Sequence, residues 1–155
     1  MITFKLNGKE VQTNSKPTKR LLDVLREEFG LTAPKEGCGE GECGACAILL
    51  NGDLINSCIT PIGGVQNAEV ITLEGFRETP QYKLLEKTFA VCGAVQCGYC
   101  TPGMIMAAQS LLSKKPHPTE QDIREGISGN LCRCTGYNMI INAVLMAAKE
   151  GEGLW

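Results

Sequence analysis

The stretch Cys38-Gly39-Glu40-Gly41-Glu42-Cys43-Gly44-Ala45-Cys46 decides how the rest of the chain is interpreted. Its C-x4-C-x2-C spacing is that of plant-type [2Fe–2S] ligation, and Cys58 supplies a fourth ligand from the next predicted strand. A cluster held by four thiolates is an anion, so the surrounding backbone N–H groups must turn inward, which the glycines of the stretch allow. A structural zinc site, which usually has paired C-x2-C knuckles, or a plain thiol loop is the alternative.

A second set of cysteines lies in the last third of the chain, as Cys97-Gly-Tyr-Cys100 and Cys132-Arg-Cys134. Each pair directly precedes a predicted helix start, where partial positive charge and free N–H groups favour thiolates. A C-x2-C pair alone would also suit a thioredoxin-like redox site, but the C-x-C pair is too tight for a zinc ribbon. We therefore expect a second cluster on these four cysteines. Cys92 matches neither set and is expected to be a buried thiol.

Length, charge and cysteine count narrow the class of protein. The chain has 155 residues, nine cysteines and a formal net charge of −2, with both signs of charge mixed along it. An odd number of cysteines excludes complete disulfide pairing and favours metal. The mixed charge argues against a nucleic-acid partner, and no apolar run approaches the roughly 18 residues of a membrane span. The first residues resemble a strand rather than a signal peptide, so we expect a cytoplasmic protein.

The hydrophobic pattern changes from strands to helices along the chain, which predicts an α+β protein of two units, residues 1–75 and 76–155. The first half reads as strands around one helix. Apolar and polar residues alternate over 2–6, and strands are also expected over 47–50 and 70–73. Hairpin turns are expected at Asn7-Gly8 and Asn51-Gly52, and a helix over 21–29 that ends at Gly30. The second half reads as four helices, with starts at Thr79-Pro80, Thr101-Pro102, Thr119 and Thr135.

Three motifs in this order resemble the small iron–sulfur subunits of the molybdenum hydroxylases, the family of xanthine dehydrogenase, aldehyde oxidoreductase and carbon monoxide dehydrogenase. They are the stretch Cys38 to Cys46, Gln96-Cys97-Gly-Tyr-Cys100-Thr-Pro-Gly103 and Gly129-Asn-Leu-Cys132-Arg-Cys134-Thr-Gly-Tyr137. The resemblance covers nearly the whole chain. It implies a β-grasp ferredoxin domain followed by a four-helix bundle that binds the second cluster.

The resemblance also implies partners and site residues. The expected partners are a large subunit with molybdopterin and molybdenum and a medium subunit with FAD. The chain itself would be a non-catalytic electron-transfer subunit of an oxidoreductase, with Gln96 and Cys134 nearest the pterin. The expected metal ligands are Cys38, Cys43, Cys46, Cys58, Cys97, Cys100, Cys132 and Cys134.

Two rival functions remain open at the level of sequence. One is a free-standing carrier with two clusters, and the other is a zinc-stabilised interaction module without redox activity. The sequence does not name a substrate for the complex, since purines, nicotinate, aldehydes and carbon monoxide are all served by similar small subunits. An N-heterocycle is the favoured class.

Overall fold

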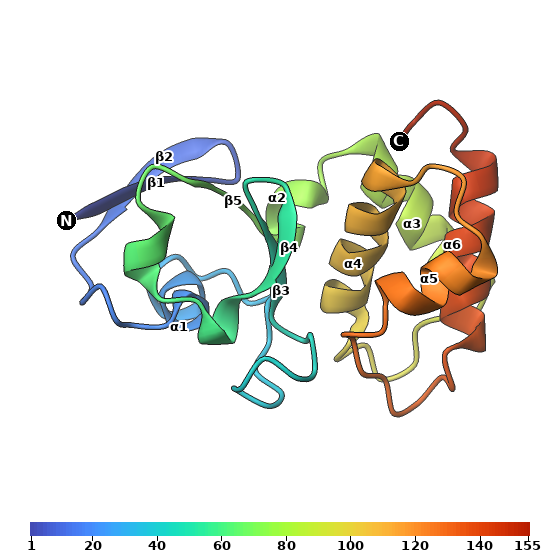
Figure 1. Ribbon diagram of the computed structural model, residues 1–155, viewed down its shortest axis with the longest axis horizontal. Coiled ribbons are helices and arrows are strands. Elements are labelled where there is room, and N and C mark those ends of the chain that lie inside the picture. Colours follow the sequence, from blue (N-terminus) through green and yellow to red (C-terminus); the bar gives the residue numbers. More distant parts are fainter.

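The computed structural model describes residues 1–155 as two units side by side, a sheet unit and a helical unit (Figure 1). The sheet unit comes first along the chain, and the helical unit follows it. None of the helices is both long and apolar enough to cross a membrane. The architecture is α+β, as predicted.

A mixed five-stranded sheet, in the order β2-β1-β5-β3-β4, forms the first unit. Strands β1 and β5 are parallel, and the other neighbouring strands are antiparallel. The strands are β1 (Ile2–Leu6), β2 (Lys9–Thr13), β3 (Ala47–Leu50), β4 (Asp53–Asn56) and β5 (Glu69–Ile71). The helical segments are α1 (Leu21–Asp23), which continues as a π-helical turn (Val24–Glu28), and two 3-10 turns (Ser57–Ile59 and Ile62–Val65).

Both predicted hairpin turns are confirmed by their backbone angles. Asn7 and Gly8 have φ of +49° and +83°, and Asn51 and Gly52 have +49° and +86°. Two consecutive positive φ values are what a two-residue type I′ hairpin requires, and asparagine and glycine are the residues that tolerate them. The strand predicted over 70–73 is wrong at its end, because β5 stops at Ile71.

Four helices make the second unit, as predicted: α3 (Pro80–Val91), α4 (Thr101–Lys114), α5 (Glu120–Gly126) and α6 (Asn138–Glu150). A short helix, α2 (Leu73–Phe76), joins the sheet unit to them. Two of the four predicted starts are confirmed, since Thr79 and Thr119 are N-caps whose side chains accept hydrogen bonds from backbone N–H groups. Thr119 and Asp122 form the predicted capping box.

The other two predicted starts are displaced, by one residue for α4 and by two for α6. Helix α4 begins at Thr101 itself with Cys100 as its N-cap, since a proline in the second position is as tolerable as one in the first. Helix α6 begins at Asn138, because Gly136 and Tyr137 are left-handed, with φ of +65° and +72°. The hydroxyl of Thr135 instead donates to the Cys132 sulfur at 3.1 Å.

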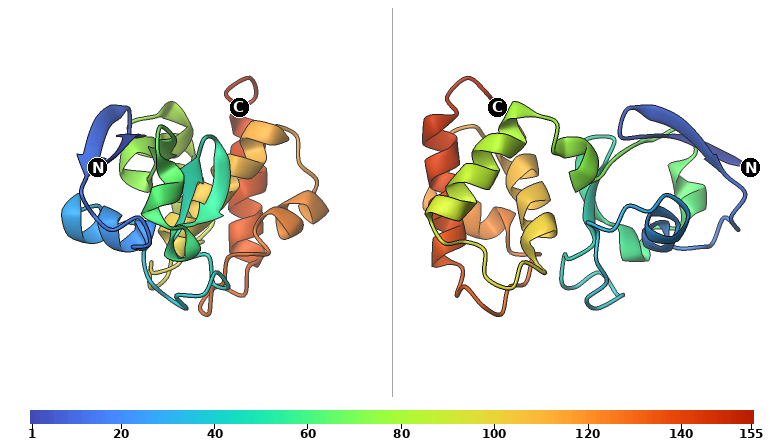
Figure 2. Two further views of the ribbon diagram at one scale, coloured as in Figure 1. Left: turned by 60° about the vertical axis from the view of Figure 1, so that its left-hand side comes forward. Right: turned by 180° about the vertical axis from the view of Figure 1, so that it is seen from behind.

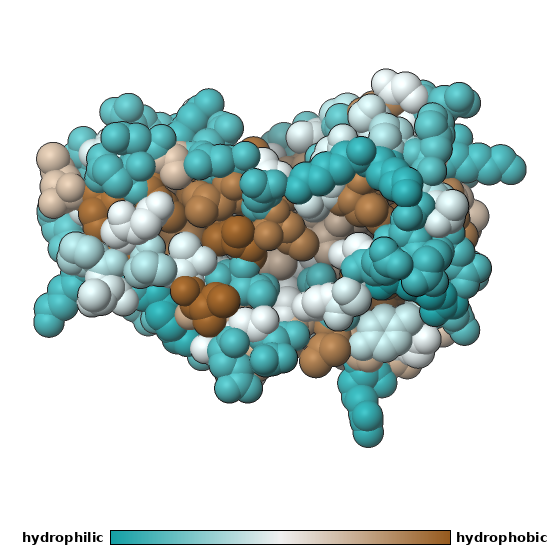
Figure 3. Space-filling model, in the orientation of Figure 1, coloured by the Kyte–Doolittle hydropathy of each residue, from teal (hydrophilic) through white to brown (hydrophobic).

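The sheet contributes to two hydrophobic cores because β3 is buried on both faces. Ile48 belongs to the core of the sheet unit, where it lies with Phe4 and with Leu25 from the π-helical turn after α1. Leu49, on the opposite face of the strand, belongs to the helical core, which is centred on α4 and α6. The views in Figure 2 show α1 and α4 on opposite sides of the sheet. Apolar surface accordingly runs across the junction of the two units (Figure 3).

Candidate metal centres

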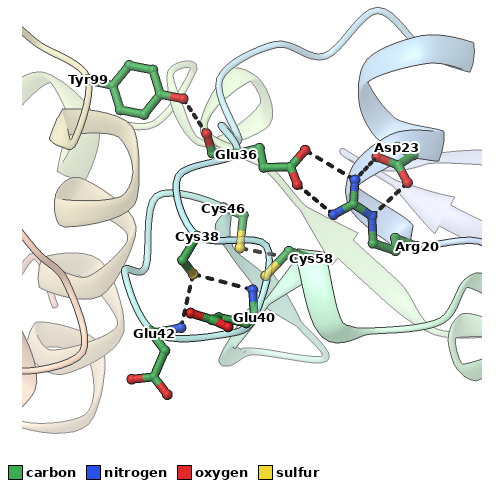
Figure 4. A network of polar contacts seen from close by, with 9 residues as sticks. All are labelled: Arg20, Asp23, Glu36, Cys38, Glu40, Glu42, Cys46, Cys58 and Tyr99. Atoms are coloured by element: carbon green, nitrogen blue, oxygen red, sulfur yellow. Dashed lines mark hydrogen bonds and ion pairs between the residues drawn. The ribbon is translucent and has the colours of Figure 1, made fainter.

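The loop before β3 turns several backbone N–H groups onto one cysteine sulfur (Figure 4). The Cys38 Sγ accepts hydrogen bonds from the backbone N–H groups of Glu40, Glu42 and Cys43, at 3.4, 3.2 and 3.4 Å. These donors lower the pKa of Cys38 to about 7, because they stabilise the thiolate. The concave run of amides predicted from the glycines is therefore present.

Two other cysteines of the first set lie in the protein interior. Cys46 and Cys58 are buried, and the Cys58 N–H donates to the Cys46 sulfur at 3.5 Å. Cys58 was predicted to lie in the next strand, but it occupies the 3-10 turn directly after β4. Burial, followed by the adjacent Cys46 thiol, raises the pKa of Cys58 to about 11. In the first set, the Cys38 sulfur therefore loses its proton readily, whereas the buried Cys58 sulfur does not.

An ion-pair network fixes the start of the cysteine loop, and it carried no signal in the sequence. The Arg20 guanidinium donates to both carboxylate oxygens of Glu36, at 2.7 and 3.1 Å, and to both of Asp23, at 2.8 and 2.7 Å. Arg20 lowers the pKa of Glu36. From the helical unit, the Tyr99 hydroxyl donates to the Glu36 carbonyl at 2.5 Å. Glu36 therefore anchors the loop and is not a freely solvated charge.

The second set of cysteines is assembled at the N-terminal end of α4 and in the loop before α6. Cys100 is the N-cap of α4 and lies against the Cys132 thiol. Burial, and then the Cys132 thiol, raise the pKa of Cys100 to about 12. Cys97 and Cys134 are exposed and adjacent, and contact with Cys97 raises the pKa of Cys134. The structure thus brings the two separate pairs together.

The sulfurs are arranged in pairs, which is the geometry that a dinuclear cluster needs. No three Cys, His, Asp or Glu side chains converge on a single point. In a [2Fe–2S] cluster with four thiolates, each iron takes two of them. Adjacent sulfurs occur as Cys38 with Cys43, Cys46 with Cys58, Cys100 with Cys132, and Cys97 with Cys134. The donor sets therefore fit two iron–sulfur clusters.

Two further residues singled out in the sequence lie near these sets. Cys92 is the C-terminal cap of α3 and packs against the helical core, but it is half-buried rather than buried as expected, since the helix ends at this residue. Gln96 is exposed beside Cys97, and no hydrogen bond of the chain involves its side chain.

Comparison with protein families places an iron–sulfur domain on each unit. Residues 4–70 match the 2Fe-2S iron-sulfur cluster binding domain, and residues 72–145 match the [2Fe-2S] binding domain. The nicotinate dehydrogenase small FeS subunit of Eubacterium barkeri is 52% identical over 96% of this chain and 95% of its own. The chain belongs to the small iron–sulfur subunits of the molybdenum hydroxylases. It is an electron-transfer subunit of an oxidoreductase and carries two [2Fe–2S] clusters.

Two further relatives match this chain over nearly the whole of their own length. The xanthine dehydrogenase iron-sulfur-binding subunit of Escherichia coli O157:H7 is 45% identical over 93% of this chain and 91% of its own. A chain of quinoline 2-oxidoreductase from Pseudomonas putida 86 superposes with a TM-score of 0.91 at 39% identity, covering 98% of this chain and 95% of that one. The ferredoxin-type sheet unit followed by a helical cluster-binding unit is thus the fold of the family.

Proposed function

We propose that this subunit relays electrons from a molybdopterin–molybdenum centre on a large partner to FAD on a medium partner, or to another acceptor. Each cluster, when bound, takes up and releases one electron at a time. Residues 1–75 would hold one cluster and residues 76–155 the other. The ligands are Cys38, Cys43, Cys46 and Cys58 in the first unit, and Cys97, Cys100, Cys132 and Cys134 in the second. The paired arrangement of their sulfurs is the observation that carries this assignment.

The substrate of the complex is proposed to be an N-heterocycle, with nicotinate as the first candidate. The relative at 52% identity is a nicotinate dehydrogenase subunit, and a second such subunit, from Pseudomonas putida, is 40% identical. Xanthine and quinoline, named for two other relatives, are N-heterocycles as well. The aldehyde oxidoreductase of Megalodesulfovibrio gigas, at 39% identity, represents the other substrate class.

Gln96 and Cys134 are proposed to form the contact with the pterin. The adjacent sulfurs of Cys97 and Cys134 are both exposed, so a partner can reach them. The Gln96 amide precedes Cys97 and is engaged by no group of this chain, so both its donor and its acceptor are available. A role limited to capping local backbone is not supported, since no such hydrogen bond is formed.

We also propose the cytoplasm as the site of action. No disulfide joins any of the nine cysteines, and a reducing compartment keeps thiols available for metal.

Metal analysis combined with two cysteine variants tests the assignment. The anaerobically purified chain should contain about four irons and about four acid-labile sulfides, and it should co-purify with a large subunit at fixed ratio. Cys43→Ser should remove the electron paramagnetic resonance signal of one reduced cluster, and Cys100→Ser that of the other. Cys92→Ser, a cysteine outside both sets, is the matched control and should leave both signals.

Three results would contradict the proposal. Zinc in place of iron would favour an interaction module, and a chain that purifies alone with both clusters would favour a free-standing carrier. Loss of both signals in either ligand variant, with the fold intact, would show that the two sets are not independent.

A further inference from the structure

The two cysteine loops touch each other through groups that lie on, or next to, the ligand residues. The Leu131 N–H, one residue before Cys132, donates to the carbonyl of Cys43 at 2.9 Å. The Asn130 side-chain amide donates to the carbonyl of Gly44 at 3.2 Å. A cysteine of the first set is therefore joined to a cysteine of the second by one hydrogen bond and one intervening residue.

Asn130 is placed to hold this contact. Its residue is only 4% exposed, and its amide is a buried hydrogen-bond donor in the seam between the units. A buried amide that lost its acceptor would retain its desolvation cost, so Asn130 selects the arrangement in which the Gly44 carbonyl faces it. The close fit excludes a side chain on Gly44, where a Cβ would lie 2.4 Å from the Gly129 carbonyl oxygen.

A second close contact between the two units lies beside the Asn130–Gly44 hydrogen bond. Gly103 is in the first turn of α4, and a Cβ at this position would lie 2.2 Å from the Gly44 carbonyl oxygen. The obstructing atom is backbone, so relief would require one unit to move relative to the other. Glycine makes a helix less stable than alanine does, so the close contact with Gly44 explains why residue 103 of α4 is glycine.

We propose that Asn130 is a positioning residue which, with the Gly44–Gly103 approach, sets the separation of the two cluster sites. The rate of electron tunnelling falls steeply with the distance between donor and acceptor, so a seam of this kind controls transfer between the units without touching either metal site. The inference rests on the ligand assignment proposed above. It adds a role for residues outside both ligand sets.

The test uses magnetic coupling between the two reduced clusters as a measure of their separation. The full-length chain with both clusters is reduced with dithionite, and the spin–spin splitting is recorded by electron paramagnetic resonance at low temperature. Gly103→Ala should reduce the splitting, because the new methyl group forces the seam apart. Asn130→Asp, which keeps the size and removes the donor, should reduce it as well. Gly64→Ala is the matched control, since a Cβ there meets nothing within 4 Å.

Hydrogen exchange supplies a second readout that does not depend on the clusters. In Asn130→Asp the segment 129–131 should exchange about fivefold faster, the factor expected when one hydrogen bond is lost.

The possible outcomes separate this inference from the function on which it rests. The inference is supported if both variants keep the signals of both clusters and show a smaller splitting. If Gly103→Ala fails to fold, the result for Asn130→Asp decides alone. Unchanged splitting in the variants, or no splitting in the parent chain with both clusters reduced, overturns it and leaves the ligand assignment intact. A parent chain that lacks one cluster overturns the ligand assignment instead.

Discussion

Neighbouring thiols of one cysteine set differ strongly in their chemistry because their surroundings differ. Cys38 is held by three backbone N–H donors, whereas Cys58 is buried against another thiol. Only the thiolate binds metal, so the ease of deprotonation determines which ligands are ready for iron. Cys38 is therefore better prepared than Cys58 to bind iron.

The pH dependence of thiol alkylation in the apo chain should show this difference. Cys38, with a pKa of about 7, is protonated below that pH and becomes reactive toward iodoacetamide as the pH rises through it. Cys58, with a pKa of about 11, should remain unreactive until much higher pH. Mass spectrometry of labelled peptides measures both midpoints. In denaturant the Cys38 midpoint should move up to about 8.5, the ordinary value for a thiol, and an unchanged midpoint would contradict the argument.

A single substitution tests the proposed contact of the Gln96 side chain with the pterin. In the assembled complex, Gln96→Leu keeps the approximate size and removes both hydrogen-bonding functions. Electrons derived from substrate should then reach the helical unit's cluster about tenfold more slowly, which corresponds to about 1.4 kcal/mol and is the scale of one lost hydrogen bond. Rapid-freeze electron paramagnetic resonance measures this rate. Gln12→Leu, an exposed glutamine on β2, is the control, and an equal rate in both variants would remove Gln96 from the route.

At the scale of elements, strand β3 links the two units because its faces serve different cores. Ile48 is fully buried in the core of the sheet unit, and Leu49 is 7% exposed in the helical core. A strand with both faces buried couples the stability of the layers on either side. The sheet and helices are therefore expected to unfold together.

Paired alanine substitutions on β3 test this coupling. Leu49→Ala and Ile48→Ala should each lower the free energy of unfolding by about 2–5 kcal/mol, since each leaves a cavity. Only Leu49→Ala weakens the contact between units, so it should divide the thermal transition in two. Ile48→Ala should lower the midpoint of a single transition. Circular dichroism during heating records both, and a single transition in Leu49→Ala would show that the Leu49 contact is not what couples the units.

At the scale of the whole molecule, three segments that carry cysteines of both sets lie along one edge, the lower edge in Figure 1. The loop before β3, the start of α4 and the loop before α6 all reach this edge. Exposed apolar side chains are neighbours of ligand cysteines in the sequence, among them Ile59, Tyr99 and Leu131, which are 59%, 48% and 56% exposed. Such side chains suit burial against the partner subunits proposed above.

Features encoded in short spans of sequence were predicted well. The two Asn-Gly hairpins, the capping box of α5 and the order of a sheet unit before a helical unit depend on neighbouring residues alone. The same holds for the cysteine spacings, since C-x4-C-x2-C and C-x2-C put sulfurs within reach of one another. The helix starts near Thr101 and Thr135 were misplaced, because Cys100 takes the N-cap position of α4 and the left-handed Gly136 and Tyr137 delay the start of α6.

Contacts between distant segments were decided only by the tertiary structure. The sequence by itself determined the two cysteine sets, the fold class of the chain and the family to which it belongs. The pairing of Cys100 with Cys132, the Arg20–Glu36 anchor and the seam of Asn130, Gly44 and Gly103 came only from the fold. The physical reason is that hydrophobic periodicity and capping describe how each segment is shaped, whereas the meeting of segments depends on how complete elements pack. Residues 44 and 130 have no local signal that relates them, and burial against a common surface brings them together.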